Sequence, residues 1–413
     1  MSATIVRAAL AVIDARERND VCFAIESERI TALAPFEELR RRFPDAALRT
    51  HGDGVALVPG FINGHSHAYQ ILLRGIGDDL PFARWRDEAL YRIIPDLSPD
   101  DVHRTFVTAF REMLANGITT AAEFFYLNGA GNAHAEAVIH AARTTGIRLV
   151  LARCWMDAPH APAAFRESPE TAAERTRALM AAYPEENICV APHSVHGASS
   201  EMIRAAAEFA RAANCRMHIH VAEASYEVKQ TLAQHNLTPL RLLESLGAVN
   251  DRLVAIHAIY VDEAEKEMLA HAGASVIHNP VTNQYLGDGI CDVTGLLELG
   301  VPVGLGTDAN VNGSVLDEMR AAAYLQKLER KDAGAFDAGS AFRLGTSLGA
   351  RALGVDAGEF RAGAFADYAV IDLNRLSAPA SPLVNAVVYR APAAAVRETY
   401  VGGKLIAASG ANS

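Results

Sequence analysis

Apolar, β-type runs along this chain repeatedly end in a histidine, a glutamate or an aspartate. Runs of this kind lead into His65, His67, His220, Glu223, His257 and Asp308. Burying an imidazole or a carboxylate is costly unless the group is hydrogen-bonded, paired or bound to a metal. So many potential ligands at strand ends indicate a metal site, and they favour a fold that brings the ends of its strands together.

Between about residue 59 and residue 358 the sequence alternates between short β-type runs and helical stretches. We expect eight strands, at 57–63, 118–124, 147–154, 187–192, 216–221, 253–259, 274–278 and 301–306. Ser98 is predicted to cap a helix that ends at Asn116 and Gly117. Eight strands, each followed by helical sequence, are typical of a parallel (β/α)8 TIM-like barrel, an α/β fold. A doubly wound open sheet is the alternative, but no Gly-x-Gly-x-x-Gly motif follows an early strand to support it.

Strand patterns also occupy both ends of the chain. Short strands and turns fill residues 1–58, and strands return at 366–371 and 398–406. We therefore expect the two ends to pair into one small β-sandwich domain beside the barrel. The predicted boundaries are 1–58 and 359–413 for the two parts of the β-domain and 59–358 for the barrel.

The composition of the chain indicates which partners it can bind and in which cell compartment it is expected. The chain has 413 residues and a formal net charge of -11, which disfavours nucleic acid and anionic membrane surfaces and leaves a small molecule as the expected substrate. Its five cysteines are scattered and form no Cys-x-x-Cys pair, which is typical of a reduced, cytoplasmic protein. No apolar run approaches the roughly 18 residues of a membrane span.

His65 and His67 are two positions apart at a strand end, so their side chains point to the same side. This spacing suits two imidazoles on one Zn²⁺ or Fe²⁺ ion. His220 and Asp308 would complete a set of three nitrogens and one oxygen that leaves a position open for water. The alternative is that His220 and Asp308 are hydrogen-bonded core residues. His218 is expected in the interior, and His278 either lines the pocket or satisfies backbone groups.

These residues also resemble a known family. The motifs are Pro59-Gly60-Phe61-Ile62-Asn63-Gly64-His65-Ser66-His67, His220-x-x-Glu223, His257 and Gly306-Thr307-Asp308. As a set they resemble the amidohydrolase superfamily, and within it the mononuclear deaminase branch that includes guanine, adenosylhomocysteine and triazine hydrolases. Binuclear relatives carry a carboxylated lysine on the fourth strand, where this chain offers His193. The resemblance therefore implies one divalent metal ion per chain, Zn²⁺ first and Fe²⁺ as the alternative, and we expect a homodimer.

The resemblance implies three residues in the chemistry. Glu223 would carry a proton to the leaving nitrogen; its alternative role is that of an acid at a helix N-terminus. Asp308 would bind the metal and take the proton of the attacking water. His257 would orient the hydroxide or stabilise the tetrahedral intermediate, unless it is simply a core histidine.

A closer resemblance concerns the N-formimino-L-glutamate iminohydrolases of histidine degradation. The segment His65-Ser66-His67-Ala68-Tyr69-Gln70 is similar to their His-Ser-His-Ala-Phe-Gln. This resemblance places Gln70, Arg86, Tyr126 and His193 against the substrate. Taken alone, Arg86 would be a surface ion-pair residue. His196 stands where those enzymes have an arginine that holds the glutamate carboxylate. The resemblance therefore implies the reaction type but not the glutamate part of the substrate.

Three functions follow as hypotheses. The leading one is a metal-dependent deaminase or iminohydrolase that attacks a C=N carbon of a formimino, amidine or cyclic substrate and releases ammonia. The second is a heterocycle amino- or chlorohydrolase of the purine, pterin or triazine type. The third is an inactive barrel scaffold, which loss of ligands would mark. A charged clamp around Arg86 would favour the first, and a flat aromatic slot the second.

Overall fold

The computed structural model describes residues 3–309, 311–378 and 381–409. Eight parallel strands form one sheet whose spatial order follows the chain. They are β6 (Phe61–Ser66), β7 (Ile118–Phe125), β8 (Arg148–Trp155), β9 (Asn187–Pro192), β10 (Met217–Val221), β11 (Leu253–His257), β12 (Ser275–His278) and β13 (Val303–Leu305). A bridge between Ser66 and Asp308 joins the first strand to the segment after the last. The predicted barrel is confirmed, and the doubly wound alternative, which would reverse the strand order, is wrong.

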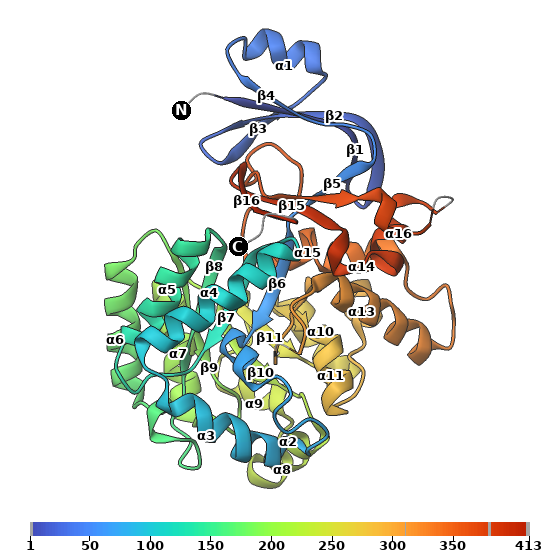
Figure 1. The fold of residues 1–413 in the computed structure, drawn as a ribbon. Helices are drawn as coiled ribbons and strands as arrows, with labels where there is room; N and C mark the ends of the chain where they lie inside the picture. Colours follow the sequence, from blue (N-terminus) through green and yellow to red (C-terminus); the bar gives the residue numbers. More distant parts are fainter. Residues whose placement is uncertain (1–2, 310, 379–380, 410–413) are drawn as a thin grey trace.

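Helices cover the outside of this barrel (Figure 1). The long ones are α4 (Pro99–Ala115), α5 (Ala133–Thr145), α6 (Pro169–Ala182), α7 (Ser200–Ala213), α8 (Ser225–His235), α10 (Glu263–Ala272) and α13 (Val315–Arg330). Shorter ones are α2 (Phe82–Trp85), α3 (Tyr91–Ile93), α9 (Pro239–Ser245), α11 (Pro280–Leu286), α12 (Val293–Glu298), α14 (Ala338–Leu344), α15 (Ser347–Leu353) and α16 (Leu383–Arg390). The short helix α1 (Phe36–Arg42) lies away from the barrel.

The predicted start of α4 is confirmed in detail. The Ser98 hydroxyl accepts a hydrogen bond from the Asp101 backbone N–H, and the Asp101 carboxylate accepts one from the Ser98 N–H. This reciprocal pair satisfies two amide groups that the first turn of a helix leaves without partners. The helix ends at Asn116, as the sequence predicts.

Strands from both chain ends form a second sheet. It contains β1 (Thr4–Ile13), β2 (Arg16–Glu26), β3 (Arg29–Leu33), β4 (Ala47–His51), β5 (Val55–Pro59), β14 (Tyr368–Asp372), β15 (Val396–Val401) and β16 (Lys404–Ala408). Phe23 of β2 contacts Tyr368 of β14, with ring centroids 5.8 Å apart, although β1 and β5 lie between these strands in the sheet. The sheet therefore curls around its own small core, and the predicted β-domain from both ends is confirmed. The boundaries at 58 and 359 stay a proposal.

One predicted strand is wrong. The expected strand at 57–63 is divided between β5 of the small sheet and β6 of the barrel. The chain changes partners at Gly60, whose N–H donates to the Asp367 carbonyl, while the next N–H, of Phe61, donates to Gly117 of the barrel. A Cβ at Gly60 would lie only 2.2 Å from the Thr119 hydroxyl oxygen, so only glycine fits at this junction.

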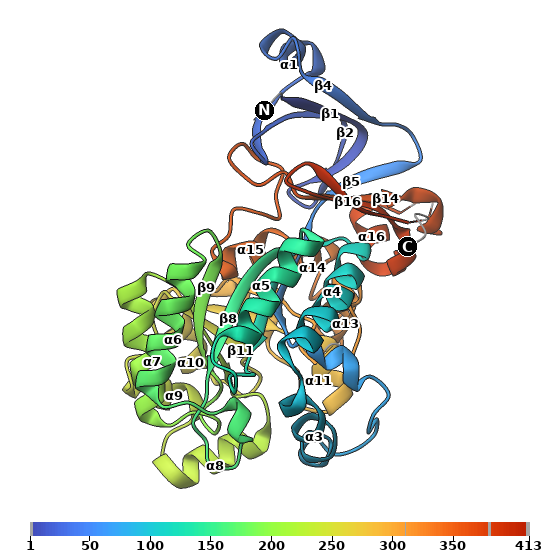
Figure 2. The same ribbon diagram turned by 60° about the vertical axis from the view of Figure 1, so that its left-hand side comes forward.

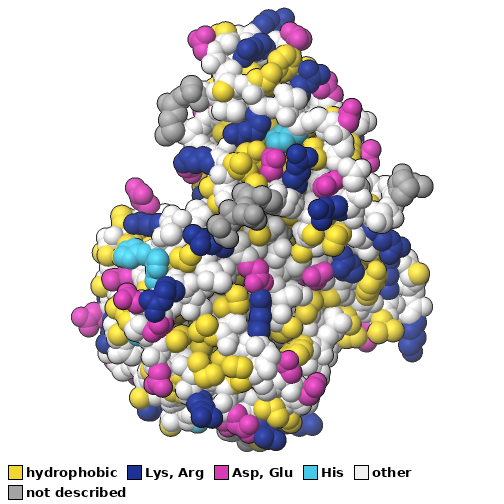
Figure 3. All heavy atoms as spheres, in the orientation of Figure 1, with side chains coloured by type: hydrophobic (Ala, Val, Ile, Leu, Met, Phe, Trp, Pro, Cys, Tyr) yellow, Lys and Arg dark blue, Asp and Glu magenta, His cyan; other side chains and the backbone are white. Residues whose placement is uncertain are grey.

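The two units lie end to end. The small sheet covers one end of the barrel, whereas α2, α3 and α8, which follow the carboxyl ends of β6 and β10, lie at the other end in both views (Figures 1 and 2). The barrel rim that carries the candidate site thus faces away from the small sheet. On the face shown in Figure 3, acidic and basic side chains are interspersed over the described residues. None of the helices described is both long and apolar enough to span a membrane.

Candidate active site

The carboxyl ends of the first and last barrel strands are joined at the rim. The His67 N–H donates to the Asp308 carbonyl over 2.9 Å, and the Asp308 N–H donates to the His65 carbonyl over 3.0 Å. Gly306 allows this approach, because a Cβ there would lie 2.7 Å from the His65 carbonyl oxygen. The Gly306-Thr307-Asp308 motif therefore places the Asp308 carboxylate beside the two histidines.

Several rim residues have a left-handed backbone. The φ angles are +52° at Ala222, +74° at His257, +48° at Ala258 and +48° at Asp308. For a residue other than glycine such a conformation costs about 1–3 kcal/mol, and it persists only where the surrounding structure imposes it. The strain is concentrated where β10, β11 and β13 end, which is where the candidate ligands and Glu223 lie.

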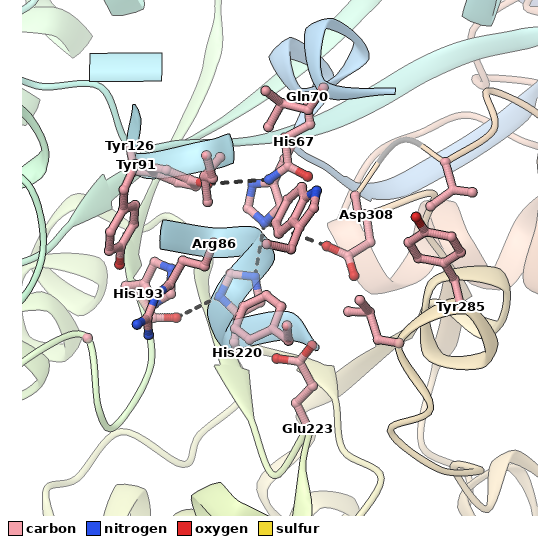
Figure 4. A pocket seen from close by; sticks show the side chains of 18 of the residues that line it. His67, Gln70, Arg86, Tyr91, Tyr126, His193, His220, Glu223, Tyr285 and Asp308 are labelled. Atoms are coloured by element: carbon pink, nitrogen blue, oxygen red, sulfur yellow. Dashed lines mark hydrogen bonds and ion pairs between the residues drawn. The ribbon is translucent and has the colours of Figure 1, made fainter. Parts of the chain in front are cut away.

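Four donor atoms converge at the centre of the rim, and Figure 4 shows three of the side chains that carry them, His67, His220 and Asp308. The His65 Nε2 atom lies 3.2 Å from Asp308 Oδ1 and 3.2 Å from His220 Nε2. The His67 Nε2 atom lies 3.2 Å from His220 Nε2 and 3.6 Å from Asp308 Oδ1. Ligands bound tetrahedrally to zinc at about 2.0–2.1 Å are roughly 3.3 Å from one another, so this spacing fits a zinc ion.

The hydrogen bonds of two of these rings leave each Nε2 atom available to bind a cation. His67 donates its Nδ1 proton to the Phe124 carbonyl over 2.8 Å, and His220 donates its own to the His193 carbonyl over 2.7 Å. The Nε2 atoms of the neutral rings therefore present lone pairs to each other. Burial, followed by the proximity of His65, lowers the pKa of His67 to about 3, so a proton does not fill this role near neutral pH. A divalent metal ion can bind both Nε2 lone pairs.

His257 is a fifth group near this centre. Ligand atoms of His65, His220, His257 and Asp308 all lie within 4.8 Å of one another. The His257 Nε2 atom is 3.8 Å from Asp308 Oδ2 and 3.5 Å from Glu223 Oε1. Burial lowers the pKa of His257 to about 4, which keeps this ring neutral. His257 thus lies beside both carboxylates of the centre as an uncharged ring.

Glu223 lies in the turn between β10 and α8, beside His257. Burial, together with the charges of Asp288 and Asp308, raises its pKa well above the usual range. The Glu227 carboxylate fixes the turn, because it accepts hydrogen bonds from the backbone N–H groups of Ala222 and Glu223 over 3.2 Å and 2.8 Å. A carboxyl group held this way can carry a proton near neutral pH.

A cavity of about 240 Å³ opens onto the metal centre. All five predicted substrate-contacting residues line it: Gln70, Arg86, Tyr126, His193 and His196. Most of the rest of the wall is aromatic or aliphatic, including Leu73, Phe82, Trp85, Leu90, Tyr91, Met156, Tyr226, Tyr285, Leu286 and Val311. The structure thus brings the predicted set together, while its role in binding stays a prediction.

Two of the predicted substrate-contacting residues, Arg86 and His196, differ in charge and in surroundings. Arg86 donates from Nε to the Asp87 carboxylate over 2.8 Å, and its guanidinium lies 5.2 Å from the Tyr91 ring centroid. In Figure 4 this guanidinium lies beside His193, away from Asp308. Burial, followed by the charges of His160 and Arg86, lowers the pKa of His196 to about 4, so His196 is uncharged near neutral pH.

Two other predicted histidines lie in the interior. His218 is fully buried on β10 below His220, as expected. His278 is also fully buried at the end of β12 and is not among the described residues that line the cavity, which favours the interior role over the pocket role. The sequence predicts no role for Glu227, Asn279, Asn283 and Asp288.

Comparisons with known proteins agree with this geometry. The family model described as "Amidohydrolase family" matches residues 56–406. The chain belongs to the amidohydrolase family. A 5-methylthioadenosine/S-adenosylhomocysteine deaminase of Natronomonas pharaonis is 35% identical over 86% of this chain and 82% of that protein. A 5'-deoxyadenosine deaminase of Methanothermobacter thermautotrophicus is 32% identical over 80% of this chain and 77% of that protein.

Solved structures show the same fold. An adenosine deaminase from Xanthomonas campestris with bound zinc is 29% identical and superimposes with a TM-score of 0.90, covering 97% of this chain and 92% of that one. An atrazine chlorohydrolase from Arthrobacter aurescens, in complex with zinc, is 24% identical with a TM-score of 0.90, covering 99% and 97%. The latter likeness shows the fold alone.

Several predictions are thereby confirmed. This amidohydrolase is an enzyme, a metal-dependent hydrolytic deaminase in class that acts on carbon–nitrogen bonds other than peptide bonds. Its cofactor is a divalent metal, and zinc is the supported ion. The inactive-scaffold hypothesis is wrong, because it required lost ligands and every predicted donor is present in the site.

Proposed function

We propose that this amidohydrolase removes an amino group from an amino-heterocycle, with a 6-aminopurine nucleoside as the substrate class, and releases ammonia. The observation that carries the proposal is the wall of the cavity. Trp85, Tyr91, Tyr126, Tyr226 and Tyr285 line it. The two described arginines that also line it already pair with carboxylates of the protein, Arg86 with Asp87 and Arg74 with Glu112. Aromatic faces suit a flat ring better than a flexible dicarboxylate.

The names of the relatives support the same class. Proteins similar over most of the chain carry the names 5-methylthioadenosine/S-adenosylhomocysteine deaminase and 5'-deoxyadenosine deaminase. All three substrates are adenosines with an altered 5' position, so deamination would occur on the purine ring. The apolar residues of the cavity wall would accommodate such a substituent.

The proposed metal ligands are His65, His67, His220 and Asp308. Four of the six pairs of their donor atoms lie 3.2–3.6 Å apart, and carbonyl groups hold the His67 and His220 rings with Nε2 free. When bound, a divalent ion acts as a Lewis acid that lowers the pKa of a water molecule towards neutrality.

Side chains of the protein would transfer the protons of the reaction. Deamination adds a water oxygen to the C=N carbon, breaks the bond to the amino group and leaves a carbonyl product. Asp308 would accept a proton from the water. Burial acts to raise the pKa of this carboxyl group, but the neighbouring histidines lower it further, so the group is ionised. Glu223 would deliver a proton to the leaving nitrogen, which departs as ammonia, and His257 would orient the water oxygen.

The proposal is tested by the substrate range of the zinc-loaded protein. We expect ammonia release from 5-methylthioadenosine, S-adenosylhomocysteine or adenosine, measured beside N-formimino-amino acids under the same conditions. Heat-treated protein and zinc-free protein serve as controls. Turnover of formimino compounds with none of the purine nucleosides would contradict the heterocycle assignment while leaving the deaminase class in place.

An iminohydrolase of N-formimino-L-glutamate type is the second candidate, and Arg86 in the cavity is the observation that favours it. His196 argues against the glutamate substrate itself, because the buried ring is neutral and supplies no charge to a second carboxylate. Losing one charged hydrogen-bonding partner costs about 1–3 kcal/mol, or roughly ten- to a hundredfold in kcat/KM.

We therefore expect N-formimino-L-glutamate to be a poor substrate and His196→Arg to raise its kcat/KM by roughly ten- to a hundredfold. Steady-state ammonia release measures this. The same exchange at the exposed His235, on α8, is the matched control and should change nothing. Efficient turnover by the unaltered protein, or no gain from His196→Arg, would count against this account.

We also propose a cytoplasmic location and a homodimer. Four of the five cysteines are buried and all five are free, which supports a reducing compartment. Light scattering of the purified protein tests the dimer.

A further inference from the structure

The two ring nitrogens of His257 have different surroundings. The Nδ1 atom lies 3.2 Å from the amide nitrogen of Asn279 and 3.1 Å from that of Asn283. An amide nitrogen donates hydrogen bonds and does not accept them, so Nδ1 must accept. In a neutral ring the proton then resides on Nε2.

The orientation of the Asn283 amide has a cause of its own. Its nitrogen also lies 3.2 Å from a carboxylate oxygen of Asp288, and that oxygen accepts hydrogen bonds. Turning the amide over would place its oxygen against both the carboxylate and the His257 ring nitrogen. Asp288 is held at this place by its own backbone, whose N–H donates to the Asn283 carbonyl over 3.0 Å. Asp288 therefore specifies which end of the Asn283 side chain faces His257.

His67 and His220 show the opposite arrangement. Their Nδ1 atoms donate to backbone carbonyls, which leaves Nε2 as a lone pair directed at the metal centre. The partners of His257 are donors, which leaves Nε2 as an N–H. The cluster thus contains two kinds of histidine. The group that contacts Nδ1 of each ring determines whether its Nε2 atom can bind a metal or donate a hydrogen bond.

The Nε2 atom of His257 points into the reaction centre. It is buried, has no hydrogen-bond partner among the described residues, and lies 3.5 Å from Glu223 Oε1 and 3.8 Å from Asp308 Oδ2. A buried N–H without a partner is costly unless a group absent from the protein itself accepts its hydrogen bond. The acceptor therefore belongs to the reacting molecules.

We propose that Asn279 and Asn283, the latter oriented by Asp288, are positioning residues that hold His257 with its proton on Nε2, so that this N–H donates to the oxygen being added to the substrate. No proton is transferred by His257 in this role; the hydrogen bond strengthens as negative charge develops on that oxygen. The identity of the acceptor rests on the proposed function, whereas the position of the proton does not.

The position of the proton is measured without any substrate. Protein labelled with ¹⁵N-histidine and loaded with zinc is studied by long-range ¹H–¹⁵N NMR, and the His257 signals are assigned by their loss in His257→Gln. We expect a protonated Nε2 and an unprotonated Nδ1, in the zinc-loaded and the zinc-free protein alike. A proton on Nδ1, or an Nε2 signal that shifts like those of the metal ligands, would overturn the proposal, even if the enzyme acts on purines as proposed.

A second experiment exchanges the amide of Asn283 and the carboxylate of Asp288. The double variant Asn283→Asp with Asp288→Asn keeps the same atoms, volume and net charge, but places a carboxylate against Nδ1. We expect the proton of His257 to move to Nδ1 and kcat to fall by roughly 10²–10³-fold, the usual effect of losing one oriented donor. The KM and the zinc content should stay as they are.

The single variant Asp288→Asn is the matched control, because its side-chain oxygen can still accept from Asn283. It should keep the proton on Nε2 and most of kcat. If the double variant does not fold, Asn279→Asp places a carboxylate at the same ring nitrogen. A double variant with an unchanged proton position, or a changed one with unaltered kcat, would show that these residues do not act through His257.

Discussion

Replacing His67 with alanine is expected to abolish both zinc binding and turnover. The ring is buried, it is held by the Phe124 carbonyl, and its Nε2 atom lies 3.2 Å from that of His220. Alanine would remove one of the four proposed donors and leave the remaining lone pairs around an incomplete site. Metal analysis of the purified protein, beside ammonia release, measures both effects.

The unaltered protein should contain one zinc ion per chain, because a single cluster of mutually close donors lies in the described part of the barrel. His271→Ala, at an exposed histidine of α10, is the control for the exchange itself and should retain zinc and activity. Two ions per chain, or full zinc content in His67→Ala, would refute the proposed ligand set.

Glu223→Gln should have the second largest effect, and it should appear in kcat. Glutamine keeps the size of the side chain and can still lie in the turn that Glu227 fixes, but it cannot carry a proton. Loss of a general acid–base group lowers the rate by roughly 10²–10⁴-fold. Steady-state kinetics on the best purine substrate, with metal analysis of the same preparation, measures the result.

The alternative role of Glu223, an acid at the start of α8, predicts a different outcome. In that case Glu223→Gln would lower the melting temperature slightly and leave kcat unchanged, since one charge near a helix N-terminus is worth about 0.3–1 kcal/mol. Glu263→Gln in the first turn of α10 makes the equivalent change at an exposed position and serves as the control. Loss of zinc from Glu223→Gln would mean that Glu223 binds the metal.

The barrel and the metal centre could be predicted because both follow from local pattern. Each barrel strand is a short apolar run, and parallel strands place their carboxyl ends at one rim, so His65, His67, His220 and Asp308 had to meet once eight strands were counted. The spacing of His65 and His67 fixed their common side. Sequence also placed Glu223 and His257 at this rim.

The rest depended on contacts that sequence spacing does not show. The break at Gly60 arises because its N–H pairs with Asp367, far away along the chain. The pairing of Asn279 and Asn283 with His257 depends on where α11, the helix that follows β12, lies relative to the end of β11. Whether Arg86 would face a substrate carboxylate or its neighbour Asp87 was a choice between two side-chain orientations, and composition has no bearing on it.

The pairing of β5 with β14 has a consequence for how the protein is made. These strands come from opposite ends of the chain, and the whole barrel lies between them in sequence. As the chain leaves the ribosome, β1 to β5 emerge first and β5 keeps an open edge until β14 has been synthesised, because hydrogen bonds between distant segments form late. Open strand edges are sites of aggregation. We therefore expect the N-terminal strands to be prone to aggregation until β14 has paired with β5, and a chain that stops before residue 368 would expose the β5 edge permanently.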